Sequence, residues 1–309
     1  ESIKEDFEDL RARLHYVIPG GAHTYSRGDD QFPSNAPPLL EYGEGCYVFD
    51  SRGQKYLDYG MALRAVTIGY ADKRINARAF EEMNKGVNLT RASRVELAAA
   101  EKLAYIVPSV EMVKFAKNGS NVTTAAVKIA RAYTGRKYVC VPRQQPFFSF
   151  DDWFIGTTPI QRGVVRESSN FTLLFDYGDI TSLKTLFSDY DGQIAAVMME
   201  PATTLTPCYN CSEIEKDDWQ NKGCAGCAKN KPNFLQEVQE LCNQTASLFI
   251  LDEMITGFRW SQAGAQQLFG VKPDLCTFGK GMANGHSLAA LGGKREIMSV
   301  GSTDINGME

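Results

Sequence analysis

Residues 248–259 read LFILDEMITGFR, and their pattern is the main evidence for the fold that we predict. Its first half is a continuous apolar run, which is typical of a strand in a parallel sheet that helices cover on both faces. The run ends in Asp252 and Glu253. Ligands of open α/β sheets bind beyond the carboxyl ends of the strands, so two acids at this point indicate a site. Taken alone, the pattern also fits a strand end with solvated acids.

This run is one of four, which occupy residues 138–141, 194–199, 247–251 and 275–278. Segments with a 3.6-residue period separate them, such as the one that starts after Pro232. This alternation predicts an α/β fold with a mostly parallel central sheet and helices on both faces. We expect residues 1–50 to form an N-terminal helix and arm, and residues 51–309 to form the large domain.

Lys280 follows the last of these runs and lies between two glycines, in DLCTFGKGMANG. A lysine amine with a lowered pKa forms a Schiff base with an aldehyde. A carboxylate at a neighbouring strand end, such as Asp252, keeps a pyridine nitrogen protonated. The pair therefore predicts a pyridoxal 5'-phosphate (PLP) enzyme, with Lys280 as the Schiff-base lysine and Asp252 as the partner of the ring nitrogen.

Two further segments complete this prediction. Residues 118–121 (NGSN) follow a short strand and open a helix, whose free amides and dipole favour a phosphate group. A plain Asn or Ser N-cap is the alternative reading. Residues 146–154 (PFFSFDDWF) are dense in aromatics. Either they are core residues or one of them, Phe147, stacks on the pyridine ring.

In their order, these motifs resemble the class-III aminotransferases of PLP fold type I. The resemblance is to the branch that contains glutamate-1-semialdehyde aminomutase and aminotransferases of bacterial surface-sugar pathways. The matching segments lie between residues 18 and 298 and read IPGGAHTYSRG, FAKNGSNVTTAAVKIARAYTGR, MMEPA, LDEMITGFR, PDLCTFGKGMANG and GGKREIM. Besides Lys280 and Asp252, the resemblance implies cofactor contacts at Gly119, Ser120, Asn121, Glu200 and Met254.

The same resemblance implies a substrate-carboxylate arginine at Arg27 and a homodimer in which Thr303 reaches the neighbouring subunit's phosphate. It also implies a small C-terminal domain, which we expect to be missing from this chain. The sequence departs from the family pattern at two places. Phe147 begins Phe-Phe-Ser where the family has aromatic-His-Gly, and residues 282–286 replace a run of three glycines.

The resemblance implies an aminotransferase that moves an amino group from an amino-acid donor to a carbonyl acceptor, either a sugar or another carboxylate-bearing substrate. An intramolecular aminomutase on the same scaffold is the alternative. The departure around Asn284 and His286 favours transfer over mutase chemistry.

Four cysteines lie within residues 203–231, a stretch without clear periodicity that we interpret as an insertion. Two C-x-x-C pairs separated by twelve residues have the spacing of a four-thiolate zinc site. The predicted ligands of a structural Zn²⁺ are Cys208, Cys211, Cys224 and Cys227. Two disulfides are the alternative for the thiols. A non-catalytic binding module built around the zinc knuckle is the alternative for the whole chain.

Composition excludes several other classes. The 309 residues carry 33 Lys and Arg against 37 Asp and Glu, a net charge of −4, which argues against a nucleic-acid binder. No apolar run reaches the roughly 20 residues of a membrane helix. We therefore expect a cytoplasmic enzyme whose partners are small molecules and a second copy of itself, with neither nucleic acid nor membrane.

Overall fold

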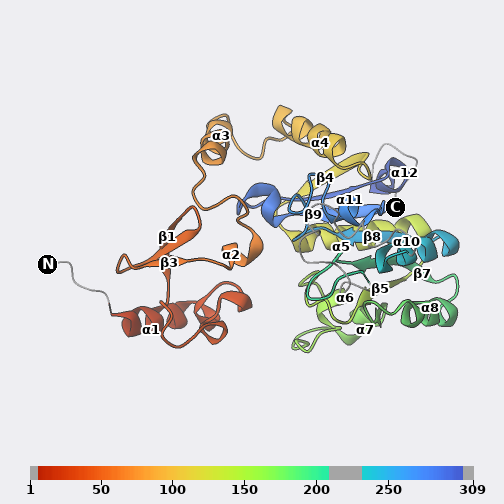
Figure 1. The fold of residues 1–309 in the computed structure, drawn as a ribbon, viewed down its shortest axis with the longest axis horizontal. Helices are drawn as coiled ribbons and strands as arrows, with labels where there is room; N and C mark the ends of the chain where they lie inside the picture. The colour runs from red at the N-terminus through yellow and green to blue at the C-terminus, as the bar shows by residue number, and fades with distance from the viewer. Residues whose placement is uncertain (1–5, 209–231, 302–309) are drawn as a thin grey trace, which may run out of the picture. The chain divides into compact units, whose positions relative to one another are not determined.

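The computed structural model describes residues 6–208 and 232–301 (Figure 1). The chain divides into two compact units, residues 1–90 and residues 91–309. We had predicted a boundary after residue 50, forty residues earlier. The difference arises because the strands on both sides of that point pair with each other in a sheet of their own, so they belong to one unit.

The first unit contains short elements around this three-stranded antiparallel sheet of order β1-β2-β3. Its elements are α1 (Phe7–Val17), β1 (Leu40–Glu44), β2 (Tyr47–Asp50), β3 (Lys55–Leu57), α2 (Met61–Arg64) and α3 (Lys73–Met83). The irregular arm carries three short 3-10 turns, at Pro19–Gly21, Tyr25–Arg27 and Asp29–Gln31. A hairpin of β2 and β3 turns around residues 51–54.

The second unit is built on a seven-stranded sheet of order β4-β10-β9-β8-β7-β5-β6. Its strands are β4 (Met112–Ala116), β5 (Tyr138–Pro142), β6 (Thr172–Phe175), β7 (Ile194–Met199), β8 (Leu248–Asp252), β9 (Leu275–Phe278) and β10 (Ala289–Gly293). The four strands predicted from apolar runs are present, as β5, β7, β8 and β9. Each of them pairs in parallel with the next one in the sheet.

Helices connect these strands. They are α4 (Arg94–Ile106), α5 (Gly119–Thr134), α6 (Asp152–Ile155), α7 (Arg166–Ser169), α8 (Ile180–Asp189), α10 (Phe234–Thr245), α11 (Ala265–Phe269) and α12 (Arg295–Met298), with 3-10 turns η5 (Lys280–Ala283) and η6 (Ser299–Gly301). Helix α10 begins at a capping box between Asn233 and Gln236, directly after Pro232. Among the described residues, no helix is long and apolar enough to cross a membrane.

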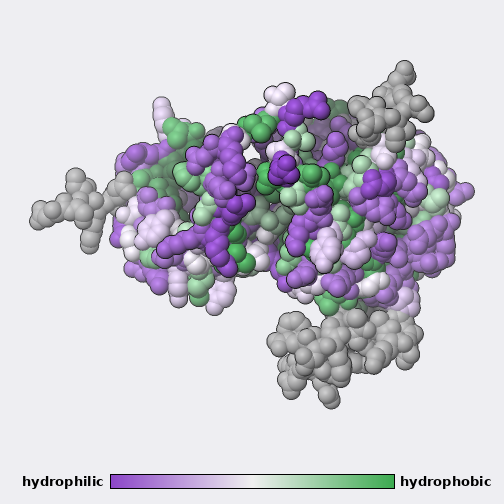
Figure 2. Space-filling model, turned by 90° about the horizontal axis from the view of Figure 1, so that it is seen from above, coloured by the Kyte–Doolittle hydropathy of each residue, from purple (hydrophilic) through white to green (hydrophobic). Residues whose placement is uncertain are grey.

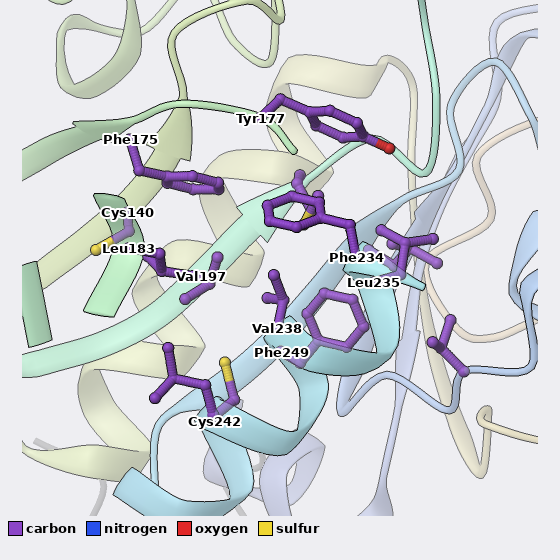
Figure 3. Close-up of a cluster of buried hydrophobic side chains, with 14 of the residues drawn as sticks. Cys140, Phe175, Tyr177, Leu183, Val197, Phe234, Leu235, Val238, Cys242 and Phe249 are labelled. Carbon is purple, nitrogen blue, oxygen red and sulfur yellow. The ribbon is translucent and has the colours of Figure 1, made fainter. Parts of the chain in front are cut away.

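Helices cover both faces of the sheet, as predicted. Strand β7 shows this within six residues, because its side chains alternate between two cores. Val197 and Met199 pack with α8 and α10 in one cluster, which Figure 3 shows around Phe234 and Phe249. Ala196 and Met198 pack with α5 in the other cluster. The continuous apolar runs in the sequence result from this double burial.

Candidate active site

Five chain segments meet at one edge of the large sheet. Strands β5, β7, β8 and β9 run parallel to each other, and β10 runs antiparallel to both β9 and β4, so β4 shares the direction of β9. The carboxyl ends of these five strands therefore lie along the same edge. The segments that follow them start at residues 117, 143, 200, 253 and 279. Each contains or adjoins at least one residue that we predicted for the site.

Asp252, the last residue of β8, is 2% exposed and its carboxylate is held in one orientation. Oδ1 accepts two hydrogen bonds, from the Thr277 hydroxyl at 2.8 Å and from the Met254 amide at 2.9 Å. Oδ2 accepts none from any residue that the structure describes. The side chain is therefore fixed through one oxygen, and the other oxygen is left for a donor from elsewhere.

Burial raises the pKa of Asp252 above that of an ordinary carboxyl group. The hydrogen bonds from Thr277 and from the Met254 amide oppose this shift, and so does the positive charge of Lys280. Lys280 and Asp252 thus interact electrostatically across neighbouring parallel strands. A buried carboxylate with a perturbed pKa and a nearby lysine, at the ligand-binding edge of a parallel sheet, is typical of a catalytic site.

Lys280 opens η5, directly after β9, with a backbone φ of 45°. Residues other than glycine rarely adopt this left-handed backbone conformation, and those that do are found preferentially at functional sites. The preceding residue, Gly279, has an extended backbone. A Cβ atom at Gly279 would lie 2.2 Å from the Met254 sulfur, so this position has no room for a side chain.

Met254 lies between two of the predicted cofactor segments. Its thioether contacts Gly279, and its terminal methyl would lie 3.0 Å from a Cβ atom at Gly119. Gly119 is the first residue of α5, so a single side chain packs against both the lysine turn and the predicted phosphate turn. This placement agrees with the apolar backing that we predicted for Met254.

The predicted phosphate turn forms the first turn of the 16-residue helix α5. Asn118 caps the helix through the amide of Asn121 at 3.1 Å. A helix leaves its first amides without partners inside the helix, and its dipole is positive at this end. Ser120 is buried, and its hydroxyl accepts a hydrogen bond from the Phe150 amide at 3.3 Å. The turn is therefore tied to the aromatic loop that follows β5.

Phe147 lies in this aromatic loop and is 50% exposed, whereas its neighbour Phe148 is buried. The Phe147 and Phe154 rings form a T-shaped pair with a centroid distance of 6.2 Å. The Phe148 carbonyl accepts a hydrogen bond from the Thr123 hydroxyl of α5 at 2.8 Å, which fixes the loop beside the helix. The stacking role of Phe147 stays a prediction.

Glu200 directly follows β7 and is 5% exposed. The Gln145 side chain, 3% exposed, pairs with the Glu200 backbone at two points: it donates to the carbonyl and accepts from the amide, both at 2.8 Å. The loops after β5 and β7 are therefore joined at the edge of the sheet. Our sequence analysis missed Gln145, since a single polar residue after a strand carries no motif.

Other predicted residues belong to the first unit, to the core, or to segments outside the described residues. Arg27 belongs to the first unit, where its guanidinium contacts Nε2 of His23 at 3.0 Å. Thr303 lies outside the described residues, as do three of the four predicted zinc ligands, Cys211, Cys224 and Cys227. Cys208 is buried in the core beside α10. No group of three or more metal-ligand side chains occurs within residues 6–208 and 232–301.

Comparison with known proteins points to one family. The family described as Aminotransferase class-III matches residues 31–177 and 221–307. Glutamate-1-semialdehyde 2,1-aminomutase of Aquifex aeolicus is 32% identical over 299 residues, which is 94% of this chain and 66% of the relative. The 3-aminobutyryl-CoA aminotransferase of Cloacimonas acidaminovorans is 32% identical over 285 residues, 92% of this chain and 63% of the relative. The chain thus spans slightly less than two thirds of these relatives.

Solved structures of PLP enzymes and transaminases have the same fold as this chain. The PLP internal aldimine form of the FumI protein from Sphingopyxis sp. MTA144 superposes with a TM-score of 0.82 and 26% identity, over 98% of this chain and 68% of that one. An omega-transaminase from Sphaerobacter thermophilus gives the same TM-score and identity, over 98% of this chain and 67% of that chain. The predicted fold, the large domain of PLP fold type I, is confirmed.

Proposed function

The chain belongs to the class-III aminotransferase family, and we propose that it binds PLP and transfers amino groups between small molecules. The main support for the proposal is the position of Asp252 and Lys280 at the carboxyl ends of the neighbouring strands β8 and β9, where the charge of Lys280 lowers the pKa of Asp252. Within residues 6–208 and 232–301, Asp252 Oδ2 accepts no hydrogen bond, and a protonated pyridine nitrogen could donate one to it.

The surrounding residues fit the rest of the group. A phosphate would lie at the start of α5, beside Gly119, Ser120 and Asn121. The amides of Gly119 and Ser120 would bind it, because the Asn121 amide already donates to the Asn118 side chain. Because residue 279 is a glycine, only the Met254 side chain occupies the space next to it. The Lys280 amine would hold the cofactor at its aldehyde carbon. When bound, the cofactor supplies an electron sink for charge that develops on the substrate.

We assign the following roles to the chain's own side chains. Asp252 would hold a proton on the ring nitrogen. Lys280 would hold the cofactor, and its amine, when free, would accept and return the substrate proton. Glu200, whose backbone is fixed by Gln145, would border the cofactor.

Covalent attachment is the direct test of this proposal. The purified protein, loaded with PLP and reduced with borohydride, should carry its label on the peptide that contains Lys280. A Lys280→Ala variant treated in the same way controls for surface lysines, which also react with aldehydes. A wild-type protein that carries no label beyond that of the Lys280→Ala variant, or a protein that does not bind PLP, would overturn the proposal.

The intramolecular aminomutase remains the second candidate, because the relatives include enzymes named for each reaction. We favour transfer to a carbonyl acceptor, with Arg27 as the group that recognises a substrate carboxylate. Incubation with amino-acid donors and single acceptors separates the two reactions. A transaminase releases a keto acid from the donor, whereas a mutase returns an isomer of its substrate and no keto acid.

We further propose that the active form is a homodimer in which Thr303 of one subunit reaches the phosphate site of the other. Several large apolar side chains of the first unit are strongly exposed, among them Tyr59 (87%), Phe80 (64%) and Leu89 (57%). Apolar patches also appear between polar ones on the face that Figure 2 displays. Exposed apolar surface of this kind is typical of an interface. Light scattering of the active protein tests the stoichiometry, and an active monomer would contradict it.

The structural zinc ion remains part of the proposal, with Cys208, Cys211, Cys224 and Cys227 as its ligands. The spacing of the two C-x-x-C pairs supports it. It assumes reduced thiols and hence a cytoplasmic location. Elemental analysis should find one Zn²⁺ per chain, and replacing Cys224 with Ser should lower the zinc content while PLP stays bound. A wild-type protein without zinc would exclude the site.

A further inference from the structure

We infer that Thr277 is a positioning residue for Asp252: its hydroxyl holds one carboxylate oxygen and thereby selects the other to face the cofactor. The inference rests on the proposed PLP function. Thr277 lies in β9, directly opposite Asp252 of β8 in the register of the parallel pair. Registered residues of neighbouring strands point to the same face of a sheet. The hydroxyl accordingly meets Oδ1 at 2.8 Å.

The contact is fully enclosed, since Thr277 is 0% and Asp252 is 2% exposed. No bulk water competes for Oδ1 in such a place, so the loss of the hydroxyl would leave a buried acceptor with one donor fewer. The remaining donor is the Met254 amide, which comes from the backbone and cannot be removed by a side-chain substitution. Thr277 is therefore the side chain that controls the orientation of this carboxylate.

Thr277 is itself held firmly. Its carbonyl accepts a hydrogen bond from the Glu253 amide at 2.9 Å, and β9 lies between β8 and β10, where Thr277 pairs with Leu291. A β-branched side chain in a strand has few rotamers to choose from. The strand therefore fixes the position of the Thr277 hydroxyl relative to Asp252 Oδ1. Asp252 is oriented from a rigid strand and not from a loop.

The electrostatic effect has a clear direction. Burial raises the pKa of Asp252, and the hydrogen bond from Thr277 lowers it. Donation to the charged form of an acid stabilises that form. With the hydroxyl, Asp252 stays ionised and the shared proton stays on the ring nitrogen. Without the Thr277 hydroxyl, the shared proton shifts toward Asp252, which leaves a neutral carboxyl group and an unprotonated ring nitrogen.

The test compares Thr277→Val, which keeps the shape and removes the hydroxyl, with Thr277→Ser, which keeps the hydroxyl. The proteins are loaded with PLP labelled with ¹⁵N in the ring, and the ¹⁵N chemical shift reports protonation of the ring nitrogen. Wild type and Thr277→Ser should show a protonated nitrogen throughout the neutral range. In Thr277→Val the ¹⁵N shift should move toward that of an unprotonated nitrogen throughout the neutral range, and the Kd for PLP should rise about tenfold, the effect of one hydrogen bond to a charged group.

A double-mutant cycle separates positioning from a general effect on folding. If Thr277 acts through the Asp252 charge, Thr277→Val should change the Kd for PLP much less in the Asp252→Asn background than in wild type. Equal losses in both backgrounds, or a ring nitrogen in Thr277→Val that titrates as in Thr277→Ser, would overturn the inference. A wild-type protein that binds no PLP would instead refute the proposed function. Should Thr277→Val not fold, Thr277→Ala serves in the same comparison.

Discussion

Gln145 and Glu200 are joined by two hydrogen bonds of 2.8 Å that run between the Gln145 side-chain amide and the Glu200 backbone. One residue follows β5 and the other follows β7, so the pair continues the contact of these two strands past their last registered residues. A side-chain amide thereby acts as one more peptide group of the sheet. It fixes the backbone of Glu200 at the edge where the proposed cofactor would lie.

Replacing Gln145 with Leu should destabilise the protein by about 2–4 kcal/mol. The backbone N–H and the backbone carbonyl of Glu200, both buried, would each lose a hydrogen-bond partner. Urea denaturation monitored by circular dichroism measures the change. The matched control is Gln161→Leu, since Gln161 is exposed. Equal stabilities for the two variants would contradict the importance of the pair.

The apolar runs of the sequence predicted four central strands because burial on both faces removes polar positions from a strand. Strand β7 matches its predicted bounds of residues 194–199. Strand β10, which reads AALGG, was not predicted, because alanine and glycine have low strand propensity. Its five residues are nevertheless fully packed between β4 and β9. Tertiary packing overrides local propensity at this strand.

The candidate site was predictable only in part, for a related reason. Asp252 and Lys280 stand at the ends of recognisable strands, and α/β topology brings such ends together. Thr277 looks like an ordinary strand residue, and only the register that places it opposite Asp252 reveals its contact. Register between strands that are distant in sequence depends on the whole sheet. A single sequence carries little information about it.

Gly279→Ala should weaken PLP binding through a steric conflict and not through the backbone. The φ of Gly279 is −175°, an extended conformation that alanine also adopts. Its Cβ atom, however, would lie 2.2 Å from the Met254 sulfur, so Met254 has to move. Forced repacking of this kind costs about 1–3 kcal/mol.

Truncation of the opposing side chain tests this cause. In the double variant Gly279→Ala with Met254→Ala, the conflict is absent, and a titration with PLP should recover part of the affinity that Gly279→Ala lost relative to the single Met254→Ala variant. If the second substitution only adds to the loss, Met254 is not the obstacle.

Asp252→Asn should lower turnover by roughly 10²-fold or more, since the amide keeps the hydrogen bonds to Oδ1 but cannot hold a proton on the ring nitrogen. Steady-state kinetics of the PLP-saturated variant measures this. The fold serves as the control, because the circular dichroism spectrum should remain that of the wild type. Turnover near the wild-type value would exclude Asp252 as the partner of the ring nitrogen.

In the PLP-free protein, the same substitution should increase stability relative to wild type as the pH rises. Burial raises the pKa of Asp252 in the folded state, so the folded state holds this proton more tightly than the unfolded state does. The contribution of Asp252 to stability is therefore largest below its unfolded pKa and falls as pH rises through the folded pKa. Asparagine does not titrate, so Asp252→Asn should gain stability relative to wild type over that rise. Urea denaturation at a series of pH values should give diverging midpoints; parallel ones would contradict the shift.

Glu253, next to Asp252, faces the other side of the sheet and holds the start of α11. It is 0% exposed, and its carboxylate accepts hydrogen bonds from the Ala265 amide at 2.9 Å and the Gln266 amide at 2.8 Å. The Thr256 hydroxyl and the Gln266 side chain donate to the same group. Four donors converge on two oxygens, which matches the lone pairs of a carboxylate.

Glu253→Gln should therefore destabilise the protein by about 2–4 kcal/mol although it keeps nearly the same shape. The new NH₂ group would face donors in place of one oxygen, leaving buried hydrogen-bond groups without acceptors. Glu167→Gln is the matched control, because Glu167 is exposed and the substitution is identical. Hydrogen exchange adds a local measurement: the amides of Ala265 and Gln266 should lose protection in Glu253→Gln and keep it in Glu167→Gln. Unchanged protection of these two amides would mean that the Glu253 carboxylate does not hold the start of α11.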